Sequence, residues 1–376
     1  MQFRAVILIF LFITMSYGCS RDNTTLLEKD GLTAQQALGK RLFFDTRLSE
    51  PEGQSCASCH NPEAAFSLPQ QTPHMPVSAG AHKQRFGNRN TPTIQYAAYI
   101  PALTYDKKEE VYVGGLFLDG RKNSLEFQAS GPVLNPVEMA VPSPQVLRHK
   151  LLSAGYEKDF QKLFGDNALV NNENTISQFS LVLAAYQRSK ELNPFSSKYD
   201  AYLTGKVKLT EQESRGLKLY EDEDKGNCAA CHPSKIGDNK QPPLFTDFTY
   251  DNLGVPANPK NPFYTQSKQY NPDGKDYVDL GLGSVLNEEM QNGKFRVSTL
   301  RNIAKTAPFM HNGVFETLEE VMDFYNTRDT KKWPKPEVEL NKNTDELGDL
   351  KLTEQEIEDI IAFLNTLTDG YVVNKL

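Results

Sequence analysis

The sequence predicts a mainly helical protein made of two similar domains. An internal repeat supports this prediction, because residues 32–36 running into 39–43 (LTAQQ, GKRLF) match residues 209–213 running into 216–220 (LTEQE, GLKLY). In each copy Thr33 or Thr210 is followed three residues later by Gln or Glu, the capping box that begins helices. A third box at Thr353 opens a segment with apolar residues at helical spacing. We therefore predict helices that begin at these three threonines.

The boundary between the two domains is predicted near residue 195. Residues 176–190 have a helical pattern, and residues 191–202, which contain Asn193-Pro194, indicate a connection. We predict an N-terminal domain over residues 31–195 and a C-terminal domain over residues 196–376. Long stretches rich in Pro, Gly, Asn and Asp have little helix signal, and such loops are usually functional. They are residues 69–101, 106–144 and 236–283.

The N-terminus has the form of an export signal. Residues 5–18 are apolar, follow a single Arg4, and are too short to span a bilayer. We expect residues 1–18 to be a signal segment and residues 19–30 a polar tail. Cys19 follows a small residue at the end of the apolar run, as in a bacterial lipoprotein signal, so lipidation is slightly favoured over a plain cleaved signal. Such a lipid anchor is the only membrane contact that the sequence suggests.

The composition is that of an ordinary globular protein with an acidic balance. The 376 residues include 41 Lys and Arg against 48 Asp and Glu, a formal net charge of −7. No basic stripe or Lys/Arg run of the kind that follows a phosphate backbone is present. A nucleic-acid partner is therefore not expected.

Four of the five cysteines lie in two identical frames, CASCH at residues 56–60 and CAACH at residues 228–232. This frame attaches haem c: Cys56 and Cys59, or Cys228 and Cys231, add to the vinyl groups, and the following His60 or His232 binds the iron. A thioredoxin-like redox site and half of a zinc site are the alternatives. Neither requires a His after each pair. Two c-type haems are therefore predicted.

Further motifs occur in order from about residue 32 to the C-terminus. Together with the two frames they resemble the bacterial di-haem cytochrome c peroxidase and MauG family. They are LGKRLFFDTRLS (38–49), RNTP (89–92), DGR (119–121), GPVLNPVEM (131–139), TLRNI (299–303) and PFMHNG (308–313). The resemblance implies an all-α fold of two cytochrome c-like domains, each with one haem c covered by long loops. It also implies that the N-terminal haem reacts with peroxide and that the C-terminal haem transfers electrons.

The resemblance implies catalytic residues above the N-terminal haem. Glu138 matches the family's distal catalytic carboxylate, and Gln128 and Pro132 match residues that line the same pocket. The chemistry agrees, because peroxide cleavage moves a proton from one oxygen to the other and a carboxylate can act as both base and acid. The alternative for Glu138 is an ordinary loop carboxylate.

Two further ligand sets are implied by the family. Asn90, Thr306 and Pro308 match a calcium site between the domains, where oxygen ligands suit a hard cation. His82 matches the loop histidine that binds the N-terminal haem of peroxidases in the resting oxidised state and leaves on reductive activation. Independently of the resemblance, His74 and His311 also lie in predicted loops and are candidate haem ligands.

Two positions depart from the peroxidase pattern. Leu118 stands where the family usually has Trp between the haems, and the only tryptophan, Trp333, is distant in sequence. Tyr325 falls at the position of the peroxidase axial Met, as in MauG. A phenolate ligand favours ferric iron and lowers the reduction potential, whereas a thioether raises it. The alternative for Tyr325 is a packed helix residue.

Three functions follow from these features. The first is a periplasmic peroxidase that reduces hydrogen peroxide to water with electrons from a small cytochrome c or cupredoxin. The second is a MauG-like enzyme that oxidises side chains of a partner protein. The third is a non-catalytic di-haem electron carrier, against which Glu138 and Gln128 argue. Tyr325 favours the second and His82 the first. We favour the first, and the sequence leaves a homodimer open.

Overall fold

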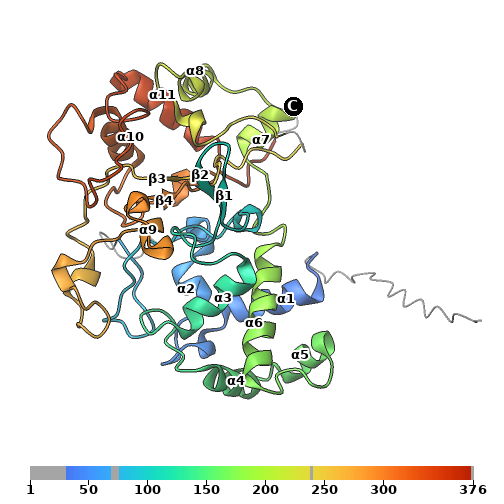
Figure 1. Cartoon of the computed structure of the whole chain (residues 1–376). Coiled ribbons are helices and arrows are strands. Elements are labelled where there is room, and N and C mark those ends of the chain that lie inside the picture. The colour runs from blue at the N-terminus through green and yellow to red at the C-terminus, as the bar shows by residue number, and fades with distance from the viewer. Residues whose placement is uncertain (1–30, 69–75, 238–239, 374–376) are drawn as a thin grey trace, which may run out of the picture.

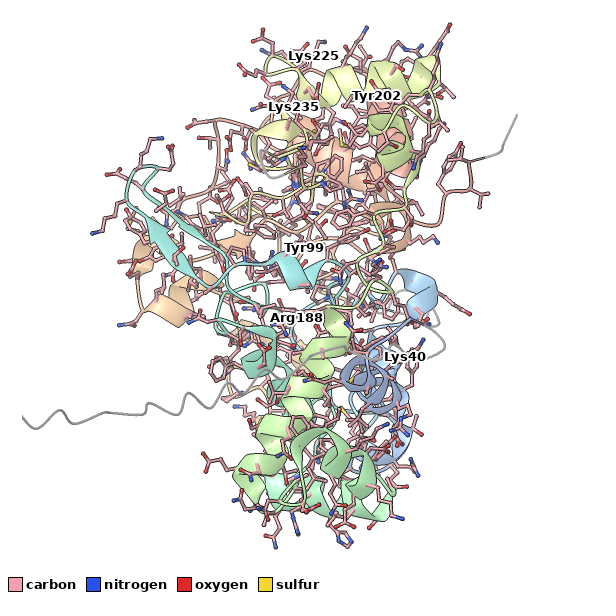
Figure 2. All side chains as sticks on the ribbon, turned by 90° about the vertical axis from the view of Figure 1, so that its right-hand side faces the viewer. Lys40, Tyr99, Arg188, Tyr202, Lys225 and Lys235 are labelled. Atoms are coloured by element: carbon pink, nitrogen blue, oxygen red, sulfur yellow. The ribbon has the colours of Figure 1, made fainter. Side chains whose placement is uncertain are left out.

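The computed structural model describes residues 31–68, 76–237 and 240–373. The predicted signal segment, the polar tail with Cys19, and His74 lie outside the described residues. The helices form two clusters at opposite ends of the molecule (Figure 1). Figure 2 shows the same arrangement from the side, with Lys40 and Arg188 in the N-terminal cluster, Tyr202 and Lys225 in the C-terminal cluster, and Tyr99 between them. Within the described residues no helix is long and apolar enough to cross a membrane.

The N-terminal cluster confirms the first predicted helix. Thr33 caps α1, and the reciprocal bond from the Gln36 side chain completes the capping box. The helix predicted over residues 176–190 is α6, which begins four residues earlier because Asn171 provides the N-cap, and ends at Gln187. The helices of this cluster are α1 (Ala34–Phe44), α2 (Cys56–Cys59), α3 (Leu125–Leu134), α4 (Pro144–Ser153), α5 (Glu157–Phe164) and α6 (Asn172–Gln187).

The C-terminal cluster confirms the other two capping boxes. Thr210 caps α8 and Thr353 caps α11, each with the reciprocal carboxylate bond. Residues 188–197 connect α6 to the first helix of this cluster. The helices of this cluster are α7 (Lys198–Leu203), α8 (Glu211–Glu221), α10 (Leu318–Thr327) and α11 (Glu354–Asn365). The short helix α9 (Leu282–Leu286) lies between the two clusters (Figure 1).

The sequence repeat corresponds to one helix crossing that occurs in both clusters. Gly39 of α1 lies against α6, where an added Cβ would fall 1.9 Å from the Val182 carbonyl oxygen. Gly216 of α8 lies against α11, where a Cβ would fall 1.9 Å from the Asp359 carbonyl oxygen. Each crossing is flanked by an aromatic pair, Phe43 with Tyr186 and Tyr220 with Phe363. Both repeated glycines are therefore required because the helix backbones approach so closely.

We expect Gly39→Ala to destabilise the protein by about 1–3 kcal/mol or more, because the added methyl group forces two helix backbones apart. The free energy of unfolding, measured in denaturant, checks this. Gly87→Ala is the matched control, because a Cβ at Gly87 meets no atom within 4 Å. Equal stability of the two variants would contradict the close crossing.

Two short antiparallel ladders depart from the all-α prediction. β1 (Thr104–Asp106) pairs with β2 (Val111–Val113), and β3 (Tyr250–Asp251) pairs with β4 (Phe295–Arg296). The first ladder is rich in β-branched and aromatic residues, and the ring centroids of the paired Tyr105 and Tyr112 lie 4.9 Å apart with the rings tilted by 56°. The predicted loop over residues 106–144 also contains α3, which Ser124 caps. Gly131 and Pro132 within α3 hid its helical pattern.

Residues 89–96 connect the two clusters through side-chain contacts. Gln95 accepts a hydrogen bond from Asn302 Nδ2 at 2.8 Å, and the Tyr96 hydroxyl group donates to Asp369 at 2.7 Å. Arg89 bridges Asp119 at 2.6 Å and Asp279 at 2.7 Å. These contacts bring loops of the first half of the chain against the C-terminal cluster, where they form part of the site described below.

Candidate functional site

The N-terminal attachment frame is held on α2. Ser55 and Ser58 cap this single turn, which carries Cys56 and Cys59. The ring of His60 follows, and its Nδ1–H donates to the Phe66 carbonyl at 3.1 Å. Because Nδ1 carries the proton, Nε2 is left with its lone pair free to bind iron.

The C-terminal frame repeats this geometry. Cys228 lies in a 3₁₀ turn (Cys228–Ala230), followed by Cys231 and His232. The Nδ1–H of His232 donates to the Phe245 carbonyl at 2.7 Å, which again leaves Nε2 free. Burial lowers the pKa of both His232 and His60, so both rings are neutral at pH 7. Each frame therefore offers two thiols and one oriented imidazole.

The surroundings of the frame cysteines argue against a thioredoxin-like redox site and against a zinc site. All four cysteines are free, and burial raises the pKa of Cys56, Cys228 and Cys231 to about 12. A redox Cys-x-x-Cys site needs a thiol with a lowered pKa. The described residues contain no group of three or more His, Cys, Asp or Glu side chains that could hold a metal ion, so a zinc site has no support there. The donor set fits haem c.

A cavity of about 310 Å³ adjoins the C-terminal frame. Cys228, Cys231 and His232 line it, and so does Tyr325 of α10. Burial raises the pKa of Tyr325. The structure thus brings Tyr325 into the same cavity as His232, although the Tyr325 ring also packs beside Phe324 as a helix residue would.

Glu138 lies beside the N-terminal frame. Burial raises the pKa of both Cys56 and Cys59, and the charge of Glu138 raises it further, so the Glu138 carboxylate lies within electrostatic range of the attachment cysteines. Burial raises the pKa of Glu138 itself, although the hydrogen bond from Asn135 Nδ2 at 2.7 Å acts in the opposite direction. A carboxyl group with a raised pKa in this position can both accept and return a proton.

The other residues predicted around Glu138 belong to α3 and the turn that follows it. Gln128 is half-buried in the middle of α3. The Pro132 carbonyl accepts the backbone N–H of Met139 at 3.2 Å, which folds the turn back onto the helix. Asn135, which holds the Glu138 carboxylate, was missed as a functional residue, although it lies in the motif GPVLNPVEM.

His82 lies on a loop that is hydrogen-bonded to the Glu138 backbone and, through Gln54, to Cys59 of α2. The backbone N–H of Ala81 donates to the Glu138 carbonyl at 2.7 Å. Gln54 Nε2 donates to the Ala79 carbonyl at 3.0 Å and to Cys59 Sγ at 3.1 Å. The His82 loop therefore lies close to Glu138 and α2. Gln54 had no distinguishing sequence signal.

The three residues of the implied calcium site also come together. Asn90, Thr306 and Pro308 line one wall of the C-terminal cavity, and Asn90 Nδ2 donates to the Pro308 carbonyl. Asn90 Oδ1 is buried and has no hydrogen-bond partner among the described residues. An unsatisfied amide oxygen beside a backbone carbonyl suits a hard cation, so these residues fit calcium.

Comparison with known proteins agrees with this geometry. Residues 33–208 match the family model of the di-haem cytochrome c peroxidases. Over 353 residues the chain is 38% identical to the methylamine utilization protein MauG of Paracoccus denitrificans, covering 89% of this chain and 89% of MauG. The chain belongs to the di-haem cytochrome c peroxidase and MauG family.

This family member is similar to the peroxidases as well as to MauG. It is 30% identical over 336 residues to the cytochrome c551 peroxidase of Nitrosomonas europaea, covering 88% of this chain and 79% of that peroxidase. The crystal structure of the diheme peroxidase BthA from Burkholderia thailandensis superposes with a TM-score of 0.79 at 34% identity, covering 92% of this chain and 87% of BthA. The protein is therefore a di-haem oxidoreductase, and the predicted family is confirmed.

The structure shows where Leu118 and Trp333 of this family member lie. Leu118 is buried and lines the C-terminal cavity. Trp333 packs against Phe315 and Phe324, and its indole N–H donates to Thr327 at 3.1 Å. Trp333 therefore has a structural role beside α10 and does not replace the family's Trp at position 118.

His311, one of the loop histidines of this di-haem protein, belongs to a buried polar cluster. Its ring stacks on Phe295 at 3.9 Å, and Nε2 lies 3.3 Å from Glu337. Glu337 also accepts the backbone N–H of Asp279 at 2.8 Å. With this nitrogen engaged by Glu337, the structure gives His311 a role in joining loops.

Proposed function

We propose that this protein binds two haem c groups and reduces hydrogen peroxide to water at the N-terminal one, with electrons from a small cytochrome c or cupredoxin. Haem supplies a redox-active iron that binds peroxide. Two electrons and two protons convert hydrogen peroxide to two water molecules. The position of Glu138 beside α2, together with its raised pKa, is the observation that carries the proposal. Asn135 orients the carboxylate toward the peroxide site.

The haem ligands follow from the same proposal. Cys56 and Cys59 hold the N-terminal haem, with His60 as proximal ligand and His82 as the ligand of a resting state that needs activation. Gln128 lies in the same distal pocket. At the C-terminal haem, Cys228 and Cys231 would form the thioether bonds, and His232 and Tyr325 would bind the iron. The calcium ion bound by Asn90, Thr306 and Pro308 fixes the two clusters relative to each other.

A MauG-like reaction is the second candidate, and Tyr325 favours it. A phenolate in the C-terminal cavity makes that haem a poor acceptor from donors of high potential, but suits storage of an oxidising equivalent. In this case peroxide oxidises side chains of a partner protein. In both cases we propose a periplasmic location, in keeping with the predicted signal segment.

Steady-state peroxide consumption by the di-haem protein tests the two candidates. We expect hydrogen peroxide to disappear in step with oxidation of a reduced small cytochrome c, at two cytochromes per peroxide. Peroxide loss that depends on a protein substrate and not on the cytochrome would favour the MauG-like reaction. A di-haem protein that leaves peroxide untouched would refute both.

A further inference from the structure

Arg296, at the end of β4, is a buried arginine without a carboxylate partner. The other buried arginines of the described chain are paired, Arg301 with Asp200 at 2.8 Å and Arg328 with Asp329. Arg296 is 9% exposed and forms no ion pair with a described residue. Its Nη1 donates to the Val297 carbonyl at 3.2 Å, whereas its Nε has no partner. Most of its five N–H donors are therefore unused.

A buried guanidinium group in this state requires an anion, and none of the residues that the structure describes provides one. Burial of an unpaired charge is costly, and native proteins compensate such charges with a partner. Burial lowers the pKa of Arg296 to about 10, so the group stays charged at neutral pH. The Phe248 ring, 5.9 Å from the guanidinium carbon, offers only a weak cation–π contact.

The position of Arg296 identifies the anion. Arg296 lines the C-terminal cavity together with His232 and Tyr325, and it is the only Lys or Arg among the described residues that do so. Its backbone N–H donates to the Leu118 carbonyl at 2.8 Å, which fixes it on the wall facing the N-terminal half of the chain. Four carboxylate residues, Asp251, Asp279, Glu337 and Glu346, also line the cavity, and their charges repel an anionic ligand.

We infer that Arg296 binds a propionate group of the C-terminal haem and raises the reduction potential of that haem. The inference rests on the proposed occupation of this cavity by haem c. A guanidinium group binds a carboxylate through two parallel N–H···O bonds, which matches the unused donors of Arg296. The positive charge disfavours the more positive ferric state, so it acts against the phenolate of Tyr325.

Arg296→Gln tests this inference by potentiometry. The haem stays attached through its thioether bonds, so its potential can be measured in the variant. We expect the one-electron equilibrium constant for reduction of the C-terminal haem to fall about tenfold, which corresponds to about 59 mV. The propionate, deprived of its cation, should protonate at a higher pH, so the potential should become pH-dependent near neutrality. Arg296→Lys should keep most of the wild-type potential.

The control is Arg41→Gln, which removes one charge from a surface pair with Asp159, in which the two side chains are 53% and 39% exposed, and should leave the potential unchanged. If the Arg296→Gln variant does not fold, Arg296→Met is measured in its place. The methionine removes the charge without burying a polar group. If haem is attached and its reduction potential and pH profile are unchanged in the variant, the inferred role of Arg296 is wrong, whereas the proposed function still stands. Absence of haem from Cys228 and Cys231 would instead overturn the proposed function.

Discussion

Glu138→Gln is expected to lower the rate of reaction with peroxide by about 10²- to 10⁴-fold, the range over which a positioned acid–base group accelerates proton transfer. The amide keeps the shape of the side chain and its bond to Asn135 but cannot take up a proton. Both haems should stay attached, because the thioether bonds involve only the cysteines. Stopped-flow mixing of the reduced protein with peroxide measures the rate.

The control for this variant is Glu126→Gln in α3. Glu126 pairs with Arg188 at 2.6 Å on the surface, and its loss should leave the peroxide rate unchanged. A pH profile adds a second test. Because burial raises the pKa of Glu138, the wild-type rate should fall on acidification at a higher pH than an ordinary carboxyl group would give. A wild-type rate in Glu138→Gln would remove Glu138 from the reaction.

Tyr325→Met is expected to raise the reduction potential of the C-terminal haem by on the order of hundreds of millivolts, since axial ligands set haem potentials over about 0.8 V. A neutral thioether no longer stabilises the ferric charge as a phenolate does. The oxidised variant should gain the near-infrared band of a His/Met haem, and ascorbate should reduce it. Spectra and redox titration measure both effects.

Tyr325→Phe separates ligation from packing. If Tyr325 only packs in α10, the phenylalanine variant should keep the spectrum of the C-terminal haem and lose at most about 0.5–1.5 kcal/mol of stability. Tyr250→Phe is the control, because it removes a buried hydroxyl group that donates to the Gly114 carbonyl at 2.6 Å. A spectrum altered in Tyr325→Phe but not in Tyr250→Phe supports ligation.

Features that depend on neighbouring residues could be predicted from the sequence. The attachment frames place two thiols and an imidazole on one turn by spacing alone. The capping boxes at Thr33, Thr210 and Thr353 likewise act within four residues, and all three helices begin there. The motif GPVLNPVEM singled out Glu138 by resemblance to the family's distal carboxylate, although the preceding helix α3 was missed because Gly131 and Pro132 weaken its pattern.

Contacts between distant segments were decided only by the tertiary structure. The cavity combines Asn90 and Leu118 of the first half of the chain with His232, Arg296 and Tyr325 of the second. Nothing in the local sequence marks Arg296 as a buried arginine without a carboxylate partner among the described residues, because a partner for a buried charge can come from any segment that packs against it. The sequence by itself determined the two CxxCH frames and the helix starts. Packing determined which side chains surround each site, because burial and charge pairing depend on groups far apart in the chain.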